Sequence, residues 1–542
     1  MNQDEVLENV PKAPSVETSP SMLSRNSSGI DWDRYDSNLH LSEERIIVEE
    51  AGERIFIPLV ERIPSFIPEQ ARRIPSLELL VPAQGSDLRR SGLISATFNM
   101  IATIVGGGVL SIPFAFQEAG IVGGTVLMIL AAIITDFSLY ILCSCSRRTG
   151  AASYGGVALC AFGPGMEFFT TIILLTYLFF VLVGFMVLVA DIFTPVIMVL
   201  LTGNANPSES VTIFGFSYRN VILLALLLML MPLLLQKDLH SLRHTCYIGF
   251  GSICILCAGI IYRALEVNIS GVHHFYHEIR YMPESISGTL FSFPIITLAF
   301  LSQFNIISVH CALADPTRKR VRQVIDGAVG ISFLLMYLFG IAGYLFGYDQ
   351  TRGNILLNFE ASDKVIFLGR AACGVTMLFV IPLSLLPCRE ALLEIPLQLM
   401  SWNTARRALK EISEQTDAAA KEGTPLISRK FTPKSLPIES TMEKRSMLES
   451  EVMHISVTVL ITASTYLVAT TVRGVEVVWG IVGSSLAFFV AYILPAACYI
   501  KLRGKRKGYL NKRIFFAWAL LVFSSIGAIM CSWENVKNAF ST

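Results

Sequence analysis

The stretch NMIATIVGGGVLSIP, residues 99–113, decides the fold of this 542-residue chain. Three consecutive glycines, Gly106, Gly107 and Gly108, interrupt a segment that is apolar enough to cross a membrane. Lipid cannot satisfy the N–H and C=O groups that an interrupted helix frees, so these groups need a partner buried in the protein. The stretch therefore predicts a membrane helix that is broken near mid-depth. Close packing of two helices is the alternative role for such a glycine cluster.

The composition places the whole chain among membrane proteins. Hydrophobic residues make up 53% and charged residues only 16%, and the mean hydropathy is +0.57. A soluble protein of this size is less apolar. Since about 20 apolar residues cross a bilayer, we expect an all-α polytopic protein with eleven spans, at residues 93–116, 121–143, 168–201, 221–235, 245–262, 287–312, 325–346, 365–387, 452–472, 477–500 and 514–531.

The positions of Lys and Arg between the spans predict the orientation. Cations concentrate after the even-numbered spans, and the loop at residues 501–513 is the most basic. Cytosolic loops carry such an excess, so these loops and residue 1 are expected in the cytosol, and residues 532–542 outside or in a lumen. The sequon Asn268-Ile-Ser270 then falls on the non-cytosolic face, where glycosylation is feasible.

Two long polar segments flank or divide the spans. Residues 1–90 are expected to form a largely disordered cytosolic tail ahead of spans one to eight at 91–388. Residues 389–451 are expected to form a partly disordered cytosolic loop ahead of spans nine to eleven at 452–531, with 391–399 as an interfacial helix. In this loop Glu422 to Ile427 is similar to an acidic dileucine signal read by sorting adaptors, although such short matches also arise by chance.

The residue inventory argues against several other functions. The net charge is only +1, which indicates no nucleic-acid partner. Nearly all of the 11 cysteines fall within or at the ends of spans, where a packing role is more common than a metal site. No cluster of His, Cys or paired acids offers a catalytic constellation. We therefore expect neither an enzyme nor a cofactor.

Several segments carry a resemblance to one family. The glycine break is followed by FAFQEAG at 114–120, and matching segments further along are SQFN at 302–305, DPT at 315–317, GYLFG at 343–347, NILLN at 354–358, PLSLLPCR at 382–389 and GSS at 483–485. With these segments the chain resembles the amino acid/auxin permease family, which includes vacuolar amino acid transporters and sodium-coupled neutral amino acid transporters. The resemblance covers about residues 91–500.

The resemblance implies the architecture of the leucine transporter. In that LeuT-like fold, spans one to five and six to ten are inverted repeats, and the first helix of each repeat is broken. An eleventh span follows the two repeats here. The chain supplies both expected breaks, at Gly106–Gly108 and at Ser302–Asn305, five spans apart.

Helix ends then predict how an amino acid would be bound. The N–H groups after Gly108 attract a carboxylate, and freed carbonyls near residues 103–105 and 300–302 accept from an ammonium group. The expected substrate-binding residues are Thr103, Gly106, Gly107, Gly108, Tyr177, Ser302, Gln303 and Asn305. For the side chains among them, a hydrogen bond between helices is the alternative role.

The coupling ion is where the chain departs from the sodium-coupled members. The sodium-coupled members carry an asparagine and a threonine that resemble Na⁺ ligands, and Ala102 and Val380 stand at those two positions here. Methyl groups cannot coordinate a hard cation. We therefore expect proton coupling or facilitated exchange. Asp136 is the only carboxylate well inside a predicted span, which makes it the proton-coupling candidate. A structural bond to a neighbouring span or a loop arginine is its alternative role.

These expectations combine into one function and one rival. The function is secondary transport of amino acids by alternating access, with one chain as the transport unit in a vacuolar or lysosomal membrane, or else in the plasma membrane. The rival is a membrane receptor that senses an amino acid with little turnover and signals through residues 1–90.

Overall fold

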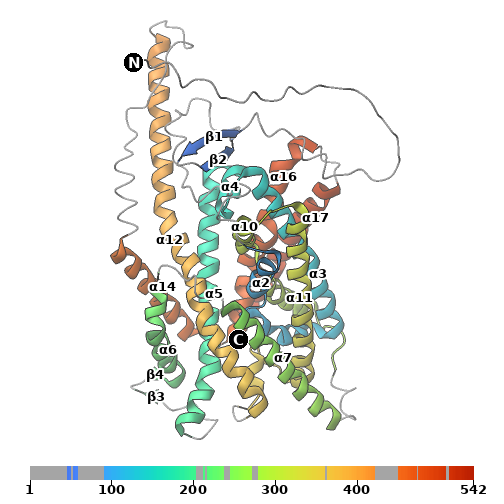
Figure 1. Ribbon diagram of the computed structural model, residues 1–542. Coiled ribbons are helices and arrows are strands. Elements are labelled where there is room, and N and C mark those ends of the chain that lie inside the picture. Colours follow the sequence, from blue (N-terminus) through green and yellow to red (C-terminus); the bar gives the residue numbers. More distant parts are fainter. Residues whose placement is uncertain are drawn as a thin grey trace, which may run out of the picture. The chain divides into compact units, whose positions relative to one another are not determined.

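The computed structural model describes residues 45–50, 53–58, 91–202, 212–213, 216–236, 245–270, 279–360, 363–421, 450–472, 474–507 and 512–541. These residues are almost entirely helical (Figure 1). The strands are β1 (Arg45–Glu50) with β2 (Glu53–Pro58), and β3 (Thr212–Ile213) with β4 (Phe216–Ser217). β3 and β4 are antiparallel, and Thr212 lies opposite Ser217.

The helices follow the apolar segments of the sequence. Their bounds are α2 (Leu93–Ile104), η3 (Gly107–Ser111), α3 (Ile112–Thr149), α4 (Tyr154–Phe162), α5 (Pro164–Thr202), α6 (Tyr218–Leu234), α7 (Thr245–Ser270), α9 (Ile286–Ala299), α10 (Gln303–Ala312), α11 (Arg318–Gly347), η5 (Tyr348–Gln350), η6 (Ile355–Asn358), α12 (Lys364–Lys421), α14 (Glu451–Thr471), α15 (Val475–Val482), the π-helices η7 (Gly483–Ala487) and η8 (Phe489–Ile493), α16 (Leu494–Lys507) and α17 (Lys512–Ser541). Side-chain caps set several starts: Ser285 accepts from Gly288 N–H, and Thr317 accepts from Arg320 N–H.

Nine helical segments of the described chain are long and apolar enough to cross a membrane. The expected first and fourth spans are not among the nine as such, because the first is broken and α6 is short. Their residues lie in the two shorter apolar helices, α2 and α6, and in the start of α3. A polytopic helical membrane fold is confirmed, and the count of eleven spans stays a prediction.

The two broken helices lie antiparallel beside each other. Where α2 begins, Ser91 N–H bonds to the Ala312 carbonyl at 2.9 Å, and its own carbonyl accepts Ala314 N–H at 2.9 Å. Further along, the rings of Phe114 in α3 and Phe291 in α9 lie 5.9 Å apart. The first helix of one predicted repeat therefore starts where that of the other ends, as inverted repeats require.

Gly120 separates the first two spans inside α3. Its φ of 71° is open to glycine but strained for other residues. A Cβ there would lie only 2.8 Å from the Met282 backbone nitrogen. The next two N–H groups, of Ile121 and Val122, bond to the carbonyls of Arg280 and Tyr281 at 2.9 Å each. This turn closes the end of the bundle that is remote from Ser91.

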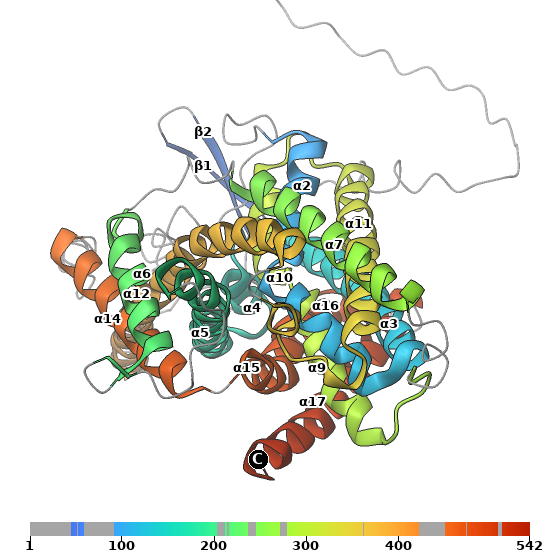
Figure 2. The ribbon, with the colours of Figure 1, turned by 90° about the horizontal axis from the view of Figure 1, so that it is seen from below.

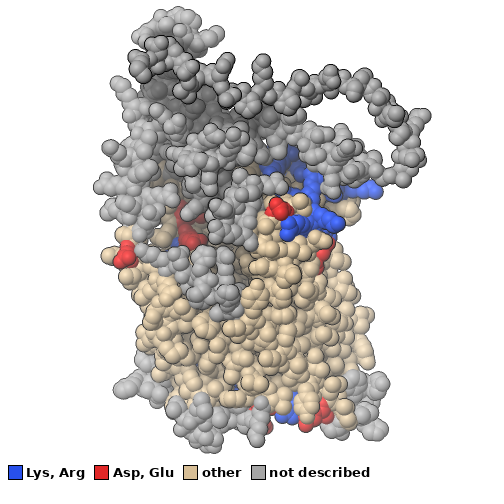
Figure 3. All heavy atoms as spheres, in the orientation of Figure 1, with Lys and Arg blue, Asp and Glu red and all other residues tan. Residues whose placement is uncertain are grey.

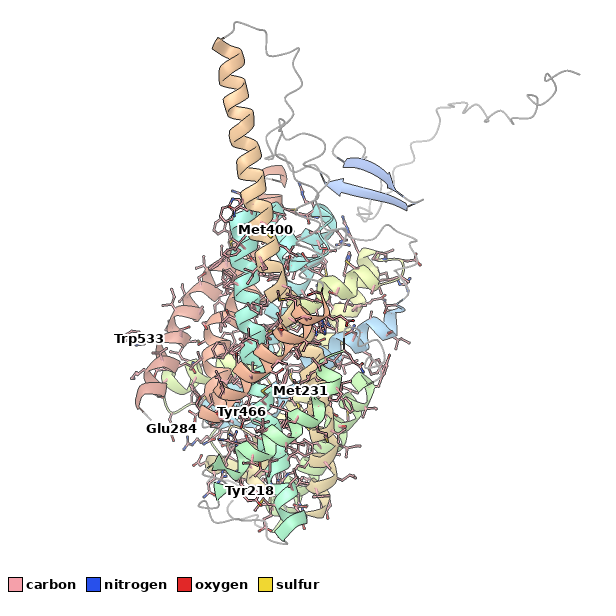
Figure 4. The ribbon with its side chains drawn as sticks, turned by 90° about the vertical axis from the view of Figure 1, so that its left-hand side faces the viewer. Tyr218, Met231, Glu284, Met400, Tyr466 and Trp533 are labelled. Atoms are coloured by element: carbon pink, nitrogen blue, oxygen red, sulfur yellow. The ribbon has the colours of Figure 1, made fainter. Side chains whose placement is uncertain are left out.

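The remaining spans surround this pair. Figure 2 shows α9, α10 and α16 near the centre, with α6 and α14 at the periphery. Tyr466 of α14 donates to the Asn220 carbonyl of α6 at 3.2 Å, which joins these two helices. Figure 4 places Tyr218 of α6 and Met400 of α12 at opposite ends of the bundle.

Three helices show features that the predicted spans do not give. α5 runs unbroken through Pro195 to Thr202. α12 continues through Pro396 to Lys421 as one helix, so residues 391–399 extend a span instead of forming a separate interfacial helix. The tenth span contains π-helical turns, and donors from α3 and α4 reach their carbonyls: Ser138 donates to Ala491, and Tyr154 donates to Val490. Such π turns are frequent at functional sites.

Candidate functional site

The first break lies between α2 and η3. Val105 N–H still bonds to the Ile101 carbonyl at 2.7 Å, but Gly106 N–H turns back to the Ile104 carbonyl at 2.9 Å. The Ala102 carbonyl therefore loses the N–H that a continuous helix would offer it. On the other side of the break, the first turn of η3 begins at Gly107 and leaves N–H groups without helical partners.

The second break lies between α9 and α10. Leu301 N–H bonds to the Leu298 carbonyl at 3.1 Å, so the Thr297 carbonyl loses its helical partner. The Ser302 carbonyl is already occupied, because it accepts Asn305 N–H at 3.1 Å. The Thr297 carbonyl, outside the expected range 300–302, is therefore free of a helical partner. Within that range the Ser302 carbonyl is not free, whereas the Phe300 and Leu301 carbonyls accept no backbone N–H among the described residues.

Polar side chains join the two breaks on one side. The Nδ2 group of Asn305 donates to the Thr103 hydroxyl at 2.7 Å and to the Asn99 Oδ1 atom at 3.2 Å. Two predicted site residues are thus brought into direct contact by an interhelical hydrogen bond. Asn99 was missed as a site residue. Its place one turn before Thr103 on the same helix was the signal that would have found it.

The glycines of the first break differ in the space around them. A Cβ at Gly108 would lie 3.1 Å from the Cα atom and 3.2 Å from the Cβ atom of Ala299 in α9. A Cβ at Gly106 would meet nothing closer than the Thr103 carbonyl at 3.8 Å. Gly108 therefore serves close packing of the two broken helices, whereas at Gly106 a Cβ would make only an ordinary van der Waals contact.

Gln303 carries a buried hydrogen-bond donor that is not used by the described residues. Its side chain is fully buried, and its Oε1 atom accepts Ser302 N–H at 3.0 Å. Among the described residues its Nε2 group has no hydrogen-bond partner. An unpaired buried donor is unfavourable by about 1–3 kcal/mol. Ser302 is also fully buried, and its hydroxyl makes only a 3.5 Å contact to the Phe300 carbonyl.

Tyr177 approaches the second break from α5. The residue is buried, and its ring centre lies 6.1 Å from that of Phe304, which directly precedes Asn305. The structure therefore brings Tyr177 to the start of α10, next to the residues of the second break.

The two ends of the bundle differ in charge and in access to the breaks. Lys and Arg gather at one end of the bundle, which we call the basic end (Figure 3). Its described cations are Arg147, Arg148, Arg318, Lys319, Arg320, Arg322, Lys501, Arg503, Lys512 and Arg513. On the side of the breaks that faces this end, Asn99 and Ser308 are exposed, and Thr103 and Asn305 are half-buried.

At the opposite end the breaks are covered. Ile355 and Leu356 of η6 are buried, and η6 contacts η3. The guanidinium of Arg370 in α12 holds this segment, since it donates to the carbonyls of Leu356 at 2.6 Å and Phe359 at 3.0 Å. Beside it, Arg280 forms an ion pair with Asp349 at 2.8 Å.

The ion-pair partner of Asp136 lies in α11 and not at either break. The Asp136 carboxylate forms an ion pair at 2.8 Å with Arg322 at the start of α11, and Arg322 also pairs with Asp326 at 2.8 Å. A pairing with an arginine is the structural role expected from the sequence as the alternative for Asp136. Arg322 was not predicted as that partner, because the pairing joins residues of two distant helices.

The candidate Na⁺ positions hold no side-chain oxygen at Ala102 and Val380. Thr376, a hydroxyl one turn before Val380, is engaged elsewhere: it donates to Ser252 of α7 at 3.2 Å and to the Ala372 carbonyl at 2.9 Å. Its hydroxyl therefore ties α12 to α7.

The sequon asparagine is engaged in the fold. Asn268 Nδ2 donates to the carbonyls of Ala264 at 2.6 Å and Leu345 at 3.0 Å, and its Oδ1 atom accepts from the Tyr348 hydroxyl. The nitrogen that a glycan would need is thus committed to holding α7 against α11. The predicted sorting signal, Glu422 to Ile427, lies outside the described residues.

Comparison with known proteins defines the class of the chain. Residues 89–536 match the family model described as transmembrane amino acid transporter protein. The chain belongs to this family of transporters, and the predicted family resemblance is confirmed.

Individual relatives agree with that assignment. The chain is 26% identical over 458 residues to vacuolar amino acid transporter 5 of Schizosaccharomyces pombe, covering 82% of this chain and 95% of the relative. It is 26% identical over 450 residues to vacuolar amino acid transporter 6 of Saccharomyces cerevisiae, covering 80% and 95%. Among solved structures, a Na⁺-coupled sialic acid symporter matches with a TM-score of 0.44 and 13% identity, covering 84% and 90%.

Proposed function

We propose that this protein is a secondary transporter that moves an amino acid across a membrane by alternating access. The observation that carries the proposal is the antiparallel meeting of two broken helices, with Thr103 and Asn305 in contact between them. Each break frees a carbonyl on one side and N–H groups on the other. A zwitterion needs this combination of acceptors and donors.

The proposed binding mode assigns each pole of the substrate to backbone groups. The carboxylate lies at the N–H groups that open η3, at Gly107 and Gly108, where the helix dipole is positive. The ammonium lies near the freed carbonyls of Ala102 and Thr297. The unpaired Nε2 group of Gln303 supplies one further donor for the carboxylate. The side chain of the substrate then extends toward Tyr177.

The state of the structure fits one half of a transport cycle. Asn99 and Ser308 are exposed on the side of the breaks that faces the basic end, which the positive-inside rule assigns to the cytosol. At the other end η6 contacts η3. We infer an inward-facing state. Opening to the other side then requires that η6 leaves η3 and that Arg370 releases the Leu356 and Phe359 carbonyls.

We further propose coupling to protons and not to Na⁺. The methyl groups of Ala102 and Val380 support this choice, since neither offers an oxygen ligand. Asp136 stays the proton-coupling candidate, and protonation of its carboxylate would break the ion pair with Arg322. In the Asp136→Asn variant we expect amino acid uptake to lose its dependence on pH. Unchanged pH dependence would exclude the role of Asp136 and leave it a structural partner of Arg322.

Several relatives are named vacuolar amino acid transporters. We propose a vacuolar or lysosomal membrane as the location, with one chain as the transport unit and with sorting adaptors at Glu422 to Ile427. Mutation of Leu426 and Ile427 to alanine tests the adaptors, because the variant is expected to move to the plasma membrane.

Counter-flow in reconstituted vesicles tests the proposed function. Vesicles preloaded with unlabelled amino acids are offered a panel of labelled ones at two internal pH values, with and without Na⁺. We expect accumulation of at least one amino acid that depends on pH but not on Na⁺. Binding without accumulation for every amino acid, together with signalling that is lost when residues 1–80 are deleted, would favour the sensing receptor instead.

A further inference from the structure

A cluster of arginines and tyrosines lies at the basic end, away from both breaks. It consists of Tyr140 and Arg147 in α3, Tyr499 and Arg503 in α16, and Arg513 at the start of α17, and we call it the arginine–tyrosine cluster. α16 packs against both α3 and α17. Figure 3 shows Lys and Arg gathered at this end of the molecule.

The aromatic rings hold the guanidinium groups in place. The Arg513 guanidinium carbon lies 5.5 Å from the Tyr140 ring centre, and its Nη1 group donates to the Tyr140 hydroxyl at 3.1 Å. The Arg503 guanidinium carbon lies 5.7 Å from the Tyr499 ring centre. Cation–π contact of this kind fixes the direction of a long side chain. The cations are therefore arranged before any ligand arrives.

Two of these cations, Arg147 and Arg503, have no acid paired with them among the described residues. The Arg147 and Arg503 guanidinium groups lie within electrostatic range of each other. In the part of the chain that the structure describes, neither forms an ion pair with a carboxylate, and the buried Nε atom of Arg503 has no hydrogen-bond partner. By contrast, Arg322, which also lies over the Tyr140 ring at 5.6 Å, is neutralised by two aspartates.

The ordinary roles of cations at this end explain only part of the arrangement. Lys and Arg set membrane orientation, and they interact favourably with the ends of α3 and α16. Either role is served by cations that point apart into solvent. Neither role requires the guanidinium groups of Arg503 and Arg513 to be held against tyrosine rings with a buried Arg503 donor unused. That arrangement is suited to a doubly charged anion with several acceptor oxygens, such as a phosphate monoester.

We propose that the arginine–tyrosine cluster binds the phosphate monoester of an anionic membrane lipid headgroup. The lipid source follows from the position of the cluster, which lies at the ends of three segments that are long and apolar enough to cross a membrane. Basic pockets between membrane helices on the cytosolic side bind such headgroups. Arg147 and Arg503 provide the paired charge, and Tyr140 and Tyr499 orient the arginines.

The test measures binding of a fluorescent short-chain phosphatidylinositol phosphate to the purified full-length protein in neutral detergent. In the double variant Arg147→Gln with Arg503→Gln, we expect the dissociation constant to rise about 25-fold, from about fivefold for each cation removed. The matched control is Arg320→Gln, which removes one cation from the same end but outside the cluster. Arg320 pairs with Asp315 at 3.4 Å, and we expect this variant to bind the lipid as the parent does.

A lysine variant and a competition with inorganic phosphate separate lipid binding from loss of the fold and from binding of a soluble ion. The double variant Arg147→Lys with Arg503→Lys keeps the charge, so it is expected to retain the fold and most of the affinity. Unchanged affinity in the glutamine variant, or an equal loss in Arg320→Gln, would overturn the proposal. Displacement of the lipid by an equal concentration of inorganic phosphate would overturn the lipid assignment, because it would mean that the site takes the soluble ion.

Discussion

Substitution of Gly108 by alanine tests how closely the two broken helices must pack. The added Cβ would lie 3.1 Å from the Ala299 Cα atom, whereas relaxed carbon contacts lie at about 3.5–4.0 Å. α9 must therefore move away by a few tenths of an ångström. Forcing a methyl group into a packed interior is unfavourable by about 1–3 kcal/mol, and the lower freedom of the unfolded chain offsets about 0.4–1 kcal/mol. We expect a net loss of about 1–2 kcal/mol.

The assay compares Gly108→Ala with Gly106→Ala in thermal unfolding and in the maximal rate of amino acid uptake. Gly106 is the matched control, because its added Cβ has no neighbour closer than 3.8 Å and its φ of −98° suits alanine. If the same energy opposes closure of the breaks around a substrate, uptake by Gly108→Ala falls about 5–30-fold. Equal stability and equal uptake of the two variants would refute the packing argument.

Three further predictions concern single side chains. In Gln303→Glu the Nε2 donor becomes an acceptor, so KM for the amino acid should rise by about tenfold or more, and an unchanged KM would remove Gln303 from the site. We expect the parent and Asn268→Gln to have the same electrophoretic mobility, with and without glycosidase treatment, because the Asn268 side chain is engaged in hydrogen bonds within the fold. Burial works to raise the pKa of Asp363, but hydrogen bonds from Arg263 and from nearby backbone N–H groups outweigh it and hold the pKa below its usual range. This pair therefore adds stability above the unfolded pKa that is lost as the pH falls through the folded pKa, and Asp363→Asn should flatten the decline in melting temperature on acidification.

The breaks were predictable from local chemistry alone. Three glycines in one span and the polar run Ser302–Asn305 in another conflict with a continuous apolar helix. α2 ends at Ile104, just before the glycines, and α9 ends at Ala299, so the second break lies at residues 300–302 and Gln303–Asn305 open α10. The family resemblance then supplied the pairing of the two spans. Neither signal reports which atoms meet, so the bond from Asn305 to Asn99 had to come from the structure.

Other parts depended on contacts between distant residues. The pairing of Asp136 with Arg322 joins α3 to α11, and no local pattern links these positions. Gln303 was a candidate by its location, but its division of roles depends on the exact start of α10: Oε1 accepts Ser302 N–H, and Nε2 has no partner among the described residues. The eighth span was predicted to end at Pro387, whereas α12 continues through Pro387 and Pro396 to Lys421.

The most direct measurement of the central claim is an experimental structure of the protein with a transported amino acid bound. The account predicts the carboxylate at the N–H groups of Gly107 and Gly108, and the ammonium within hydrogen-bond distance of the Ala102 or Thr297 carbonyl. An amino acid bound elsewhere, with the two breaks filled by protein atoms, would contradict it.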